Sequence, residues 1–327
     1  MPANLTPQYL EAEQAFKEAK TIPEKIAALE EMLAVIPKHK GTEKLQADIK
    51  RRLAKLRDES ERKAKTGRQD PFLVERHGAG QVALVGFPNS GKSALVGALT
   101  RAKVTVADYP FSTVLPVAGM MEFEDIWIQL VDMPPVTSGE MPPGMAGALR
   151  NADVLLIVAD ASSDDCLDQL EDVLSLLGEK RILRDATELE AGARGHTLED
   201  CMVVATKTDL PRAQDNLAII REYLPPGLEM VPASVRSAES LEGLRRRVFE
   251  LLGIIRIYTK VPGQPPDMGQ PFVLKKGSTV LDMAAAVHRD FPSRLKSARI
   301  WGSARFDGQS VPRDYVLHDR DVVELHV

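Results

Sequence analysis

The chain has 327 residues, 44% hydrophobic and 27% charged, with a net charge of −5, so it has room for two or three domains of ordinary globular composition. No run of 18 apolar residues exists, which excludes a membrane-spanning helix. Two cysteines, Cys166 and Cys201, exclude a disulfide framework, and the start of the chain lacks a signal-peptide pattern, so we expect a cytoplasmic protein with free thiols.

The first 66 residues are predicted to be helical. Pro23 and Pro37 bracket one helix in a stretch rich in Ala, Glu, Lys and Leu. A second helix is predicted from about Thr42 to Lys65, where Leu and Ile recur on one stripe. Two short helices joined by a break predict an antiparallel helical hairpin.

This helical region includes a basic segment. Between Lys38 and Arg68, 12 Lys/Arg and 5 Asp/Glu give a local charge of +7, which leaves −12 for the rest of the chain. A basic arm on an acidic body is typical of a protein that contacts nucleic acid or the ribosome. A solvated helix face explains the same charges equally well, because Lys and Arg favour helices and acidic residues are interleaved.

Residues 67–79 contain glycine and proline and are predicted to be a linker. From Gln81 onward, strands alternate with helices. The strand candidates are residues 81–85, 126–131, 154–159, 202–205 and 228–231, and the helical patterns lie near 94–99, 164–177, 214–223 and 239–252. This alternation predicts an α/β domain over residues 80–253, with a mainly parallel sheet covered on both faces.

The first predicted strand runs into Gly86-Phe87-Pro88-Asn89-Ser90-Gly91-Lys92-Ser93, which fits the phosphate-loop pattern G-x-x-x-x-G-K-[ST] at every fixed position. A strand before it and a helix after it are the context that the pattern needs, which disfavours a chance match in a turn. The two glycines let the backbone curl around an anion, and the helix N-terminus adds partial positive charge. Lys92 can reach the β- and γ-phosphates, and the Ser93 hydroxyl can bind Mg²⁺.

Two further oxygens can complete a metal site. Asp132 ends an apolar strand 39 residues after Ser93, and a carboxylate there can hold Mg²⁺, usually through water. Thr113, in the segment Tyr109-Pro110-Phe111-Ser112-Thr113, is the candidate mobile ligand that senses the γ-phosphate. The alternatives are a strand-end Asp that starts a turn and a loop hydroxyl; the phosphate loop favours the metal role for Asp132.

Thr206-Lys207-Thr208-Asp209 follows another predicted strand and matches [NT]-K-x-D. The Asp carboxylate can accept hydrogen bonds from N1–H and the exocyclic amine of guanine, which adenine does not offer in that arrangement. The Lys207 stem can lie along the purine face, and Ser234 after the next strand can add a contact. After a phosphate loop, this motif indicates GTP rather than ATP.

The remaining segment, residues 254–327, has a different character. A turn-rich stretch precedes a short strand at 272–274, a helix from 280 to 289 and strands near 298–301 and 321–327, which predicts a small α+β module. Its acidic and basic residues are balanced, so RNA binding does not follow from charge. Trp301 and Phe306 are expected in its core rather than as base-stacking platforms.

The ordered motifs GFPNSGKS, YPFSTV, VDMPP, TKTD and ASV resemble the Obg superfamily of translation-factor-class GTPases. The phrases ADYPFST (107–113) and IRIYTKVPGQPPD (255–267) are most similar to the developmentally regulated GTP-binding (DRG) branch. That branch carries a helical N-terminal region, a P-loop GTPase G domain and a C-terminal TGS domain, a ubiquitin-like β-grasp module. The resemblance covers nearly the whole chain and implies GTP/GDP binding with Mg²⁺, slow hydrolysis, and a role at the ribosome or on RNA. Several relatives with Asn at the position of Asn89 use K⁺, so a K⁺ requirement is a hypothesis from resemblance.

The motifs and the resemblance together assign the expected site residues. The catalytic residues are Lys92, Thr113 and Asn89, and the metal ligands are Ser93, Thr113 and Asp132. The nucleotide-binding residues are Gly86, Phe87, Pro88, Asn89, Ser90, Gly91, Lys92, Ser93, Ala94, Asp132, Thr206, Lys207, Asp209, Leu210, Ser234 and Val235.

One position departs from the family pattern. The family's third motif is D-x-x-G, whereas this chain has Asp132-Met133-Pro134-Pro135. Proline has no N–H and a fixed φ, so a γ-phosphate contact is lost and switch II is stiffened. Val136 stands where many GTPases place a water-positioning Gln, and residues 134–147 are expected to form a mobile loop without a fixed helix start.

Two functions therefore remain open. The first is a slow GTPase that relies on Lys92, Mg²⁺ and backbone N–H groups for electrostatic catalysis. The second is a GTP/GDP-binding scaffold that docks on the ribosome or RNA with little hydrolysis, which Pro135 favours. An ATP-dependent enzyme is disfavoured by TKTD, and the sequence leaves the partner and the oligomeric state open.

Overall fold

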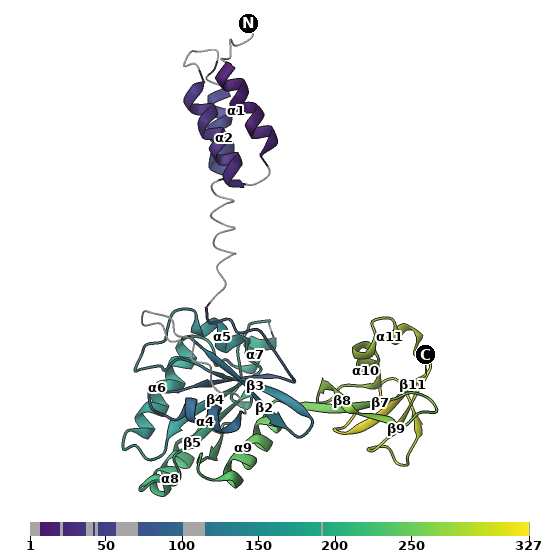
Figure 1. Ribbon diagram of the computed structural model, residues 1–327. Coiled ribbons are helices and arrows are strands. Elements are labelled where there is room, and N and C mark those ends of the chain that lie inside the picture. Colours follow the sequence, from purple (N-terminus) through teal and green to yellow (C-terminus); the bar gives the residue numbers. More distant parts are fainter. Residues whose placement is uncertain are drawn as a thin grey trace. The chain divides into compact units, whose positions relative to one another are not determined.

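The computed structural model describes residues 7–19, 22–36, 42, 45–56, 71–100, 115–190 and 192–326. The chain divides into two compact units, Met1–Asp70 and Pro71–Val327, and Figure 1 labels their elements. Within the described ranges, no helix combines the length and apolar character that crossing a membrane requires.

The first unit is helical. It contains α1 (Pro7–Glu18), α2 (Ile22–Val35) and a further helix over residues 45–56. These three segments share an apolar core made of Tyr9, Ala12, Leu29, Met32, Ile36, Ile49 and Leu53. The sequence predicts two helices here, and the structure adds α1 as a separate one. Pro23 lies in the first turn of α2, where the missing N–H has no helical partner to lose.

The second unit opens with a six-stranded sheet in the order β2-β3-β1-β4-β5-β6. Five of its strands are mutually parallel, and only β2 runs antiparallel to its neighbour β3, which confirms the mainly parallel sheet. Strand β2 was not predicted, because Gly119 and two methionines weaken its strand pattern. The strands are β1 (Gln81–Val85), β2 (Val117–Phe123), β3 (Ile126–Asp132), β4 (Val154–Asp160), β5 (Cys201–Thr206) and β6 (Glu229–Pro232).

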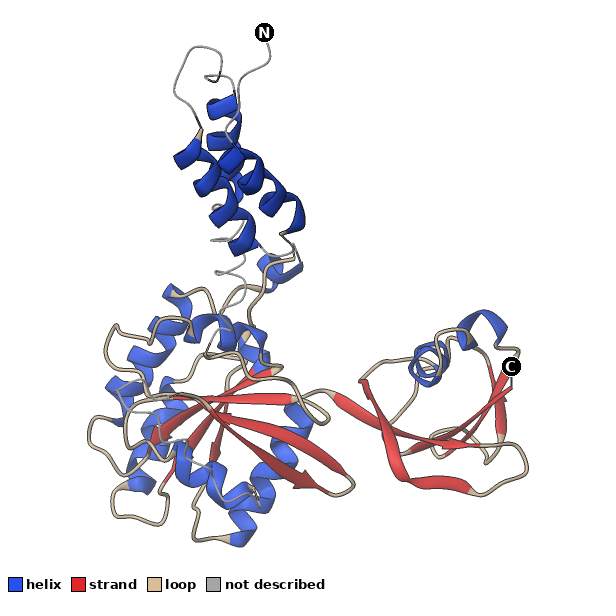
Figure 2. Cartoon of the chain, turned by 45° about the horizontal axis from the view of Figure 1, so that its top comes forward, coloured by secondary structure: helices blue, strands red, loops and turns tan. Residues whose placement is uncertain are grey.

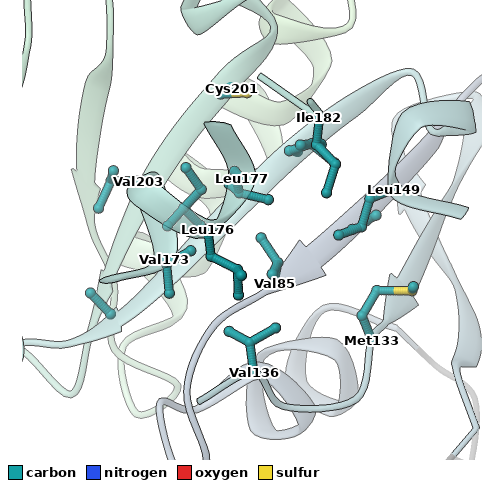
Figure 3. Close-up of a cluster of buried hydrophobic side chains, with 14 of the residues drawn as sticks. Val85, Met133, Val136, Leu149, Val173, Leu176, Leu177, Ile182, Cys201 and Val203 are labelled. Carbon is teal, nitrogen blue, oxygen red and sulfur yellow. The ribbon is translucent and has the colours of Figure 1, made fainter. Parts of the chain in front are cut away.

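Helices cover both faces of this sheet (Figure 2). Alternate residues of β1 belong to different cores: Val85 packs with residues of α6, and Leu84 packs with residues of α4 and α9. Figure 3 shows the first of these cores, in which Val85 and Val136 lie among the apolar side chains of α6. The helices are α4 (Lys92–Leu99), α5 (Met145–Asn151), α6 (Cys166–Glu179), α7 (Ala186–Glu190), α8 (Ala213–Tyr223) and α9 (Ala238–Leu251), with a 3₁₀ turn, η1 (Leu198–Asp200).

The segment just before β1, which the sequence indicates as a linker, packs against the sheet from residue 71 onward. Phe72 is buried in the core that contains Val85. Gly78 bridges to Ile128, has φ +73, and approaches so closely that a Cβ would lie 2.2 Å from the Trp127 carbonyl oxygen. A glycine is needed there because a side chain would collide with that strand.

The C-terminal part forms a second sheet in the order β10-β9-β11-β7-β8. One face packs against α10 around Ile257, Met283 and Ile300. Phe306 is 63% exposed and Trp301 lies outside this core, so the expectation that both are core residues is wrong. The elements are β7 (Ile254–Lys260), β8 (Pro266–Lys275), α10 (Val280–Val287), α11 (Phe291–Arg294), β9 (Ser297–Trp301), β10 (Gln309–Val311) and β11 (Asp321–His326).

Trp301 was expected to be a core residue, yet its side chain lies on the face of this sheet opposite α10. The ammonium of Lys260 sits 4.6 Å from the Trp301 ring centroid and 2.5 Å from the Glu324 carboxylate. Strand register places alternate residues on the two faces, so these side chains share the face that the helix does not cover.

Candidate nucleotide-binding site

The phosphate loop connects β1 to α4 and depends on its two glycines. A Cβ on Gly86 would lie 2.3 Å from the Val158 carbonyl oxygen, so only glycine lets the loop pack against β4. Gly91 has φ +98 and is the N-cap residue of α4. The loop backbone therefore turns sharply and ends at the positive end of a helix, as an anion site requires.

Lys92 is held inside this loop. It is only 6% exposed, and its Nζ donates to the carbonyl oxygens of Gly86 at 2.9 Å and Phe87 at 2.7 Å. Burial lowers the pKa of Lys92 to about 8. The ammonium group thus lies at the centre of the loop, where the terminal phosphates of a nucleotide would be bound.

Ser93 and Asp132 meet at the mouth of the loop. The Ser93 hydroxyl donates to Asp132 Oδ2 at 2.5 Å. The other oxygen, Asp132 Oδ1, is buried and accepts no hydrogen bond from the residues that the structure describes. Burial raises the pKa of Asp132, because removing a carboxylate from water disfavours its charged form and no nearby cation fully compensates for the lost solvation.

This pair fits Mg²⁺, which takes hydroxyl and carboxylate oxygens and usually keeps several waters. Among the described residues, no group of three or more His, Cys, Asp or Glu could hold a metal by itself. A site with one hydroxyl and one carboxylate suits a cation that also binds substrate phosphates. Thr113, the third expected ligand, lies outside the described residues.

The base-binding motif lies at the carboxyl ends of β5 and β6. Lys207 has φ +57, and its Nζ lies 2.5 Å from Asp160 Oδ2. Asp209 Oδ1 accepts a hydrogen bond from the Ser234 hydroxyl at 2.7 Å, and its Oδ2 pairs with Arg236 at 3.3 Å. The hydrogen bond from Ser234 lowers the pKa of Asp209, so this carboxyl is ionised and ready to accept from N–H groups.

Thr206 joins the two ends of the site. Its hydroxyl lies 2.6 Å from the Ser90 carbonyl oxygen and 3.1 Å from that of Ala159. A Cβ on Gly91 would lie 3.1 Å from the same hydroxyl oxygen. The strand that carries the base motif is therefore fixed directly against the phosphate loop.

The structure places the expected site residues, apart from Thr113, at the carboxyl-end edge of one sheet. Asn89 and Pro88 are exposed on the loop, and Asn89 has φ +60. Leu210 and Val235 are exposed beside the base motif, at 38% and 45%. Sequence reasoning missed Asp160, whose signal is a carboxylate at the end of a buried parallel strand.

Switch II follows β3 and is tied to the phosphate loop. The Val136 N–H donates to the Gly86 carbonyl oxygen at 3.2 Å, and the Val136 side chain is buried. Thr137 and Glu140 form a β-bridge, and the Ser138 hydroxyl lies 2.5 Å from Asp172 on α6. Helix α5 begins at Met145 after Gly144, which has φ +94, so the helix start is defined, contrary to the expectation.

Comparison with known proteins agrees with this geometry. Residues 81–187 match the family described as 50S ribosome-binding GTPase, and residues 255–327 match the TGS domain. An uncharacterized GTP-binding protein of Methanocaldococcus jannaschii is 30% identical over 364 residues, covering 93% of this chain and 92% of the relative. The chain belongs to the DRG family of GTP-binding proteins.

Other relatives also match this DRG-family chain over most of their length. Developmentally-regulated G-protein 2 of Arabidopsis thaliana is 29% identical, with 93% of this chain and 91% of that protein covered. The YchF GTPase of Schizosaccharomyces pombe aligns with a TM-score of 0.51 at 13% identity, over 77% of this chain and 99% of that chain, which shows a shared fold. The resemblance to the Obg superfamily and its DRG branch is confirmed.

Proposed function

We propose that this DRG-family protein binds GTP together with Mg²⁺, hydrolyses it slowly, and acts as a switch at the ribosome or on RNA. The observation that carries the proposal is the convergence of Lys92, the Ser93–Asp132 pair and the base-motif residues Lys207 and Asp209 on one sheet edge. These groups supply phosphate, metal and base contacts respectively.

The binding step follows from the contacts of Lys92. When a triphosphate enters the loop, the Lys92 ammonium exchanges the Gly86 and Phe87 carbonyl oxygens for phosphate oxygens, which carry more negative charge. Ser93 and Asp132 would hold Mg²⁺, which neutralises charge on the β- and γ-phosphates when bound. Asp209 would recognise guanine. To bind the guanine N–H groups, its Oδ2 needs only to give up the ion pair with the exposed side chain of Arg236.

Slow hydrolysis follows from switch II. Val136 is buried and carries no group that can orient a water molecule, and Pro135 has no N–H to donate to the γ-phosphate. Catalysis would then be electrostatic, by Lys92 and by the charge that Mg²⁺ would supply when held by Ser93 and Asp132, as in unassisted phosphoryl transfer with rates on the order of 10⁻⁴ to 10⁻² s⁻¹.

The alternative is a GTP/GDP-binding scaffold with little hydrolysis. It is favoured by Pro135, which has no N–H, and by the Val136 N–H, which already donates to Gly86 and cannot donate to a phosphate while that bond is intact. Releasing it needs a backbone rotation that Pro134 and Pro135 oppose.

Single-turnover GTP hydrolysis in K⁺ and in Na⁺ buffer separates the two functions. We expect a measurable wild-type rate and an increase of about tenfold in Pro135→Gly, equal to about 1.4 kcal/mol of barrier. Pro143→Gly, in the same loop but beyond the D-x-x-G position, is the matched control and should match wild type. A wild-type rate equal to buffer alone selects the scaffold, and equal rates in K⁺ and Na⁺ exclude a K⁺ requirement.

The proposed role at the ribosome is supported by the first unit and by the description of the matched G-domain family. Residues 45–56 contain four basic residues and one acidic residue. Asp48 pairs with both Arg51 at 2.7 Å and Arg52 at 2.8 Å, while Lys50 and Lys55 are exposed. This helix therefore presents net positive charge.

Co-sedimentation with ribosomes over a salt series tests this role. We expect binding to weaken as salt rises, and the Lys50→Gln/Lys55→Gln protein to show a shallower dependence. Lys17→Gln, on the opposite helix of the same unit and paired with Glu13, is the control. Binding that does not respond to salt would rule out an electrostatic role for the segment 38–68.

A further inference from the structure

A buried arginine of the TGS domain contacts the turn between β2 and β3. Arg256 of β7 is 2% exposed and donates to Glu124 and, at 2.7 Å, to Asp125, the two residues of that turn. Its Nη2 and Nε donate to the two carboxylate oxygens of Asp319 of the TGS domain, at 2.7 Å and 3.1 Å. One guanidinium thus links two carboxylates of the G domain to one carboxylate of the TGS domain.

Two more TGS side chains hold the same turn. Tyr258 donates its hydroxyl to Asp125, and Arg320 donates to Glu124. The hydrogen bond from Arg256 lowers the pKa of Glu124, so the carboxylate is held in its charged form. We call Arg256, Tyr258 and Arg320, together with Glu124 and Asp125, the turn clamp.

Aromatic contacts add to the turn clamp from the G-domain side. The Phe123 and Phe249 rings stack with centroids 4.7 Å apart, and the Arg256 guanidinium lies 5.8 Å and 5.0 Å from them. Glu124 has φ +52, a strained conformation for a residue with a side chain. The turn is therefore held in one specific shape around a guanidinium that is itself buried.

The β2–β3 hairpin connects this clamped turn to the nucleotide site. Its strands pair in continuous register from Phe123 opposite Ile126 to Val117 opposite Asp132, without a bulge. Seven pairs span about 20 Å. At the far end, opposite Val117, lies Asp132, whose carboxylate fits the metal.

We propose that the turn clamp couples the nucleotide state of the G domain to the TGS domain through the β2–β3 hairpin. A paired hairpin moves as a unit, so a shift at Asp132 when GTP replaces GDP changes the position or twist of the turn. The turn clamp binds the turn more strongly in one of these two positions than in the other. The difference in this interaction free energy is the coupling free energy between the nucleotide site and the TGS domain. By reciprocity, a partner that binds the TGS domain changes the ratio of GTP to GDP affinity. This inference rests on the proposed function, because it needs two nucleotide states.

Nucleotide affinity measured on the full chain tests the coupling. The decisive protein is Glu124→Gln/Asp125→Asn, which removes the charges of the turn but keeps its shape and leaves the Arg256–Asp319 pair intact. The probes are GDP and the non-hydrolysable analogue guanosine 5′-(β,γ-imido)triphosphate. Arg247→Ala is the matched control, because Arg247 pairs with Glu229 and Glu250 within the G domain.

We expect the ratio of the two affinities to change by about fivefold or more in the decisive protein and by less than twofold in Arg247→Ala. A change below threefold in the decisive protein overturns the proposal. If that protein does not fold, Tyr258→Phe/Arg320→Ala replaces it under the same threshold, since Arg320 is 58% exposed. Failure of wild type to bind either nucleotide would instead refute the proposed function, so the two failures are distinguishable.

Hydrogen exchange gives a second readout on the wild-type protein. We expect amides of residues 117–132 and 254–260 to exchange at different rates in the GDP and analogue complexes, and the difference in residues 254–260 to disappear in the decisive protein. Identical exchange of residues 254–260 in both complexes of the wild type also overturns the proposal.

Discussion

The two ends of the nucleotide site differ in how far their charges are removed from water. At the phosphate end, Lys92 is 6% exposed and Asp132 has a buried oxygen without a hydrogen bond from the described residues. At the base end, Asp209 and Leu210 are exposed, and Asp209 pairs with Arg236, whose side chain is 77% exposed. We therefore expect affinity to depend mainly on the phosphate end, where charge is desolvated, and base selectivity to depend on hydrogen bonds at the base end, which is open to water until the nucleotide binds.

The largest effect is expected from Lys92→Met. Loss of a buried, charge-assisted contact should weaken GTP binding by about 100-fold, since such hydrogen bonds contribute about 1.5–3 kcal/mol. Thermal stability of the nucleotide-free protein should not fall, because the variant removes a charge that burial disfavours. Titration with a fluorescent guanine nucleotide measures the first effect and thermal unfolding the second. Lys180→Met, at an exposed lysine, is the control; affinity within threefold of wild type would contradict the phosphate role.

Asp209→Asn should give a smaller loss that is confined to the base. An unpaired hydrogen bond at the base edge costs about 1–3 kcal/mol, so GTP affinity should fall by about 10- to 100-fold. Xanthosine triphosphate should then bind better than GTP, because the Asn amide can donate to the oxygen that replaces the guanine amine. Asp164→Asn, an exposed Asp paired with Arg212, is the control. Equal loss of GTP and ATP affinity would show that Asp209 does not read the base.

The pH dependence of binding should come from the phosphate end. The pKa of Lys92 is about 8 in the free protein, and bound phosphate raises it. Below pH 8 the lysine is protonated in both states, so affinity should be flat; above pH 8 binding takes up a proton, so affinity should fall by about tenfold per pH unit. Calorimetry in two buffers of different ionisation enthalpy measures the proton uptake. The Lys92→Met variant serves as the control for titration of the nucleotide itself. An equal dependence of affinity on pH in both proteins would contradict the assignment of this pH dependence to Lys92.

The smallest effect is expected from Arg236→Ala at the base end. The pair with Asp209 spans 3.3 Å and is largely exposed, and such pairs contribute about 0–1 kcal/mol. Removing Arg236 frees Asp209 Oδ2 for guanine, so GTP should bind no more than about twofold tighter, and less so at high salt. A loss of tenfold or more would mean that Arg236 contacts the nucleotide, and the contrast between the two ends would need revision.

Much of the fold was predictable because its signals are local. The alternation of apolar strands with amphipathic helices after Gln81 predicted the parallel sheet, and the glycines of the phosphate loop predicted its sharp turns. Strand β2 was missed because its sequence is a weak strand former that depends on pairing with β3. Phe306 was misplaced because hydrophobicity predicts burial on average, and only the packed module shows which apolar side chains its core excludes.

By itself the sequence determined the chemistry of the site, since the phosphate loop and TKTD each place their functional groups within a few consecutive residues whose spacing fixes their geometry. Only the tertiary structure decided how these groups are held. Lys207 pairs with Asp160, 47 residues away, and Arg256 reaches Asp125 across 131 residues. Sheet topology alone brings such partners together, and no local pattern encodes which side chains become neighbours.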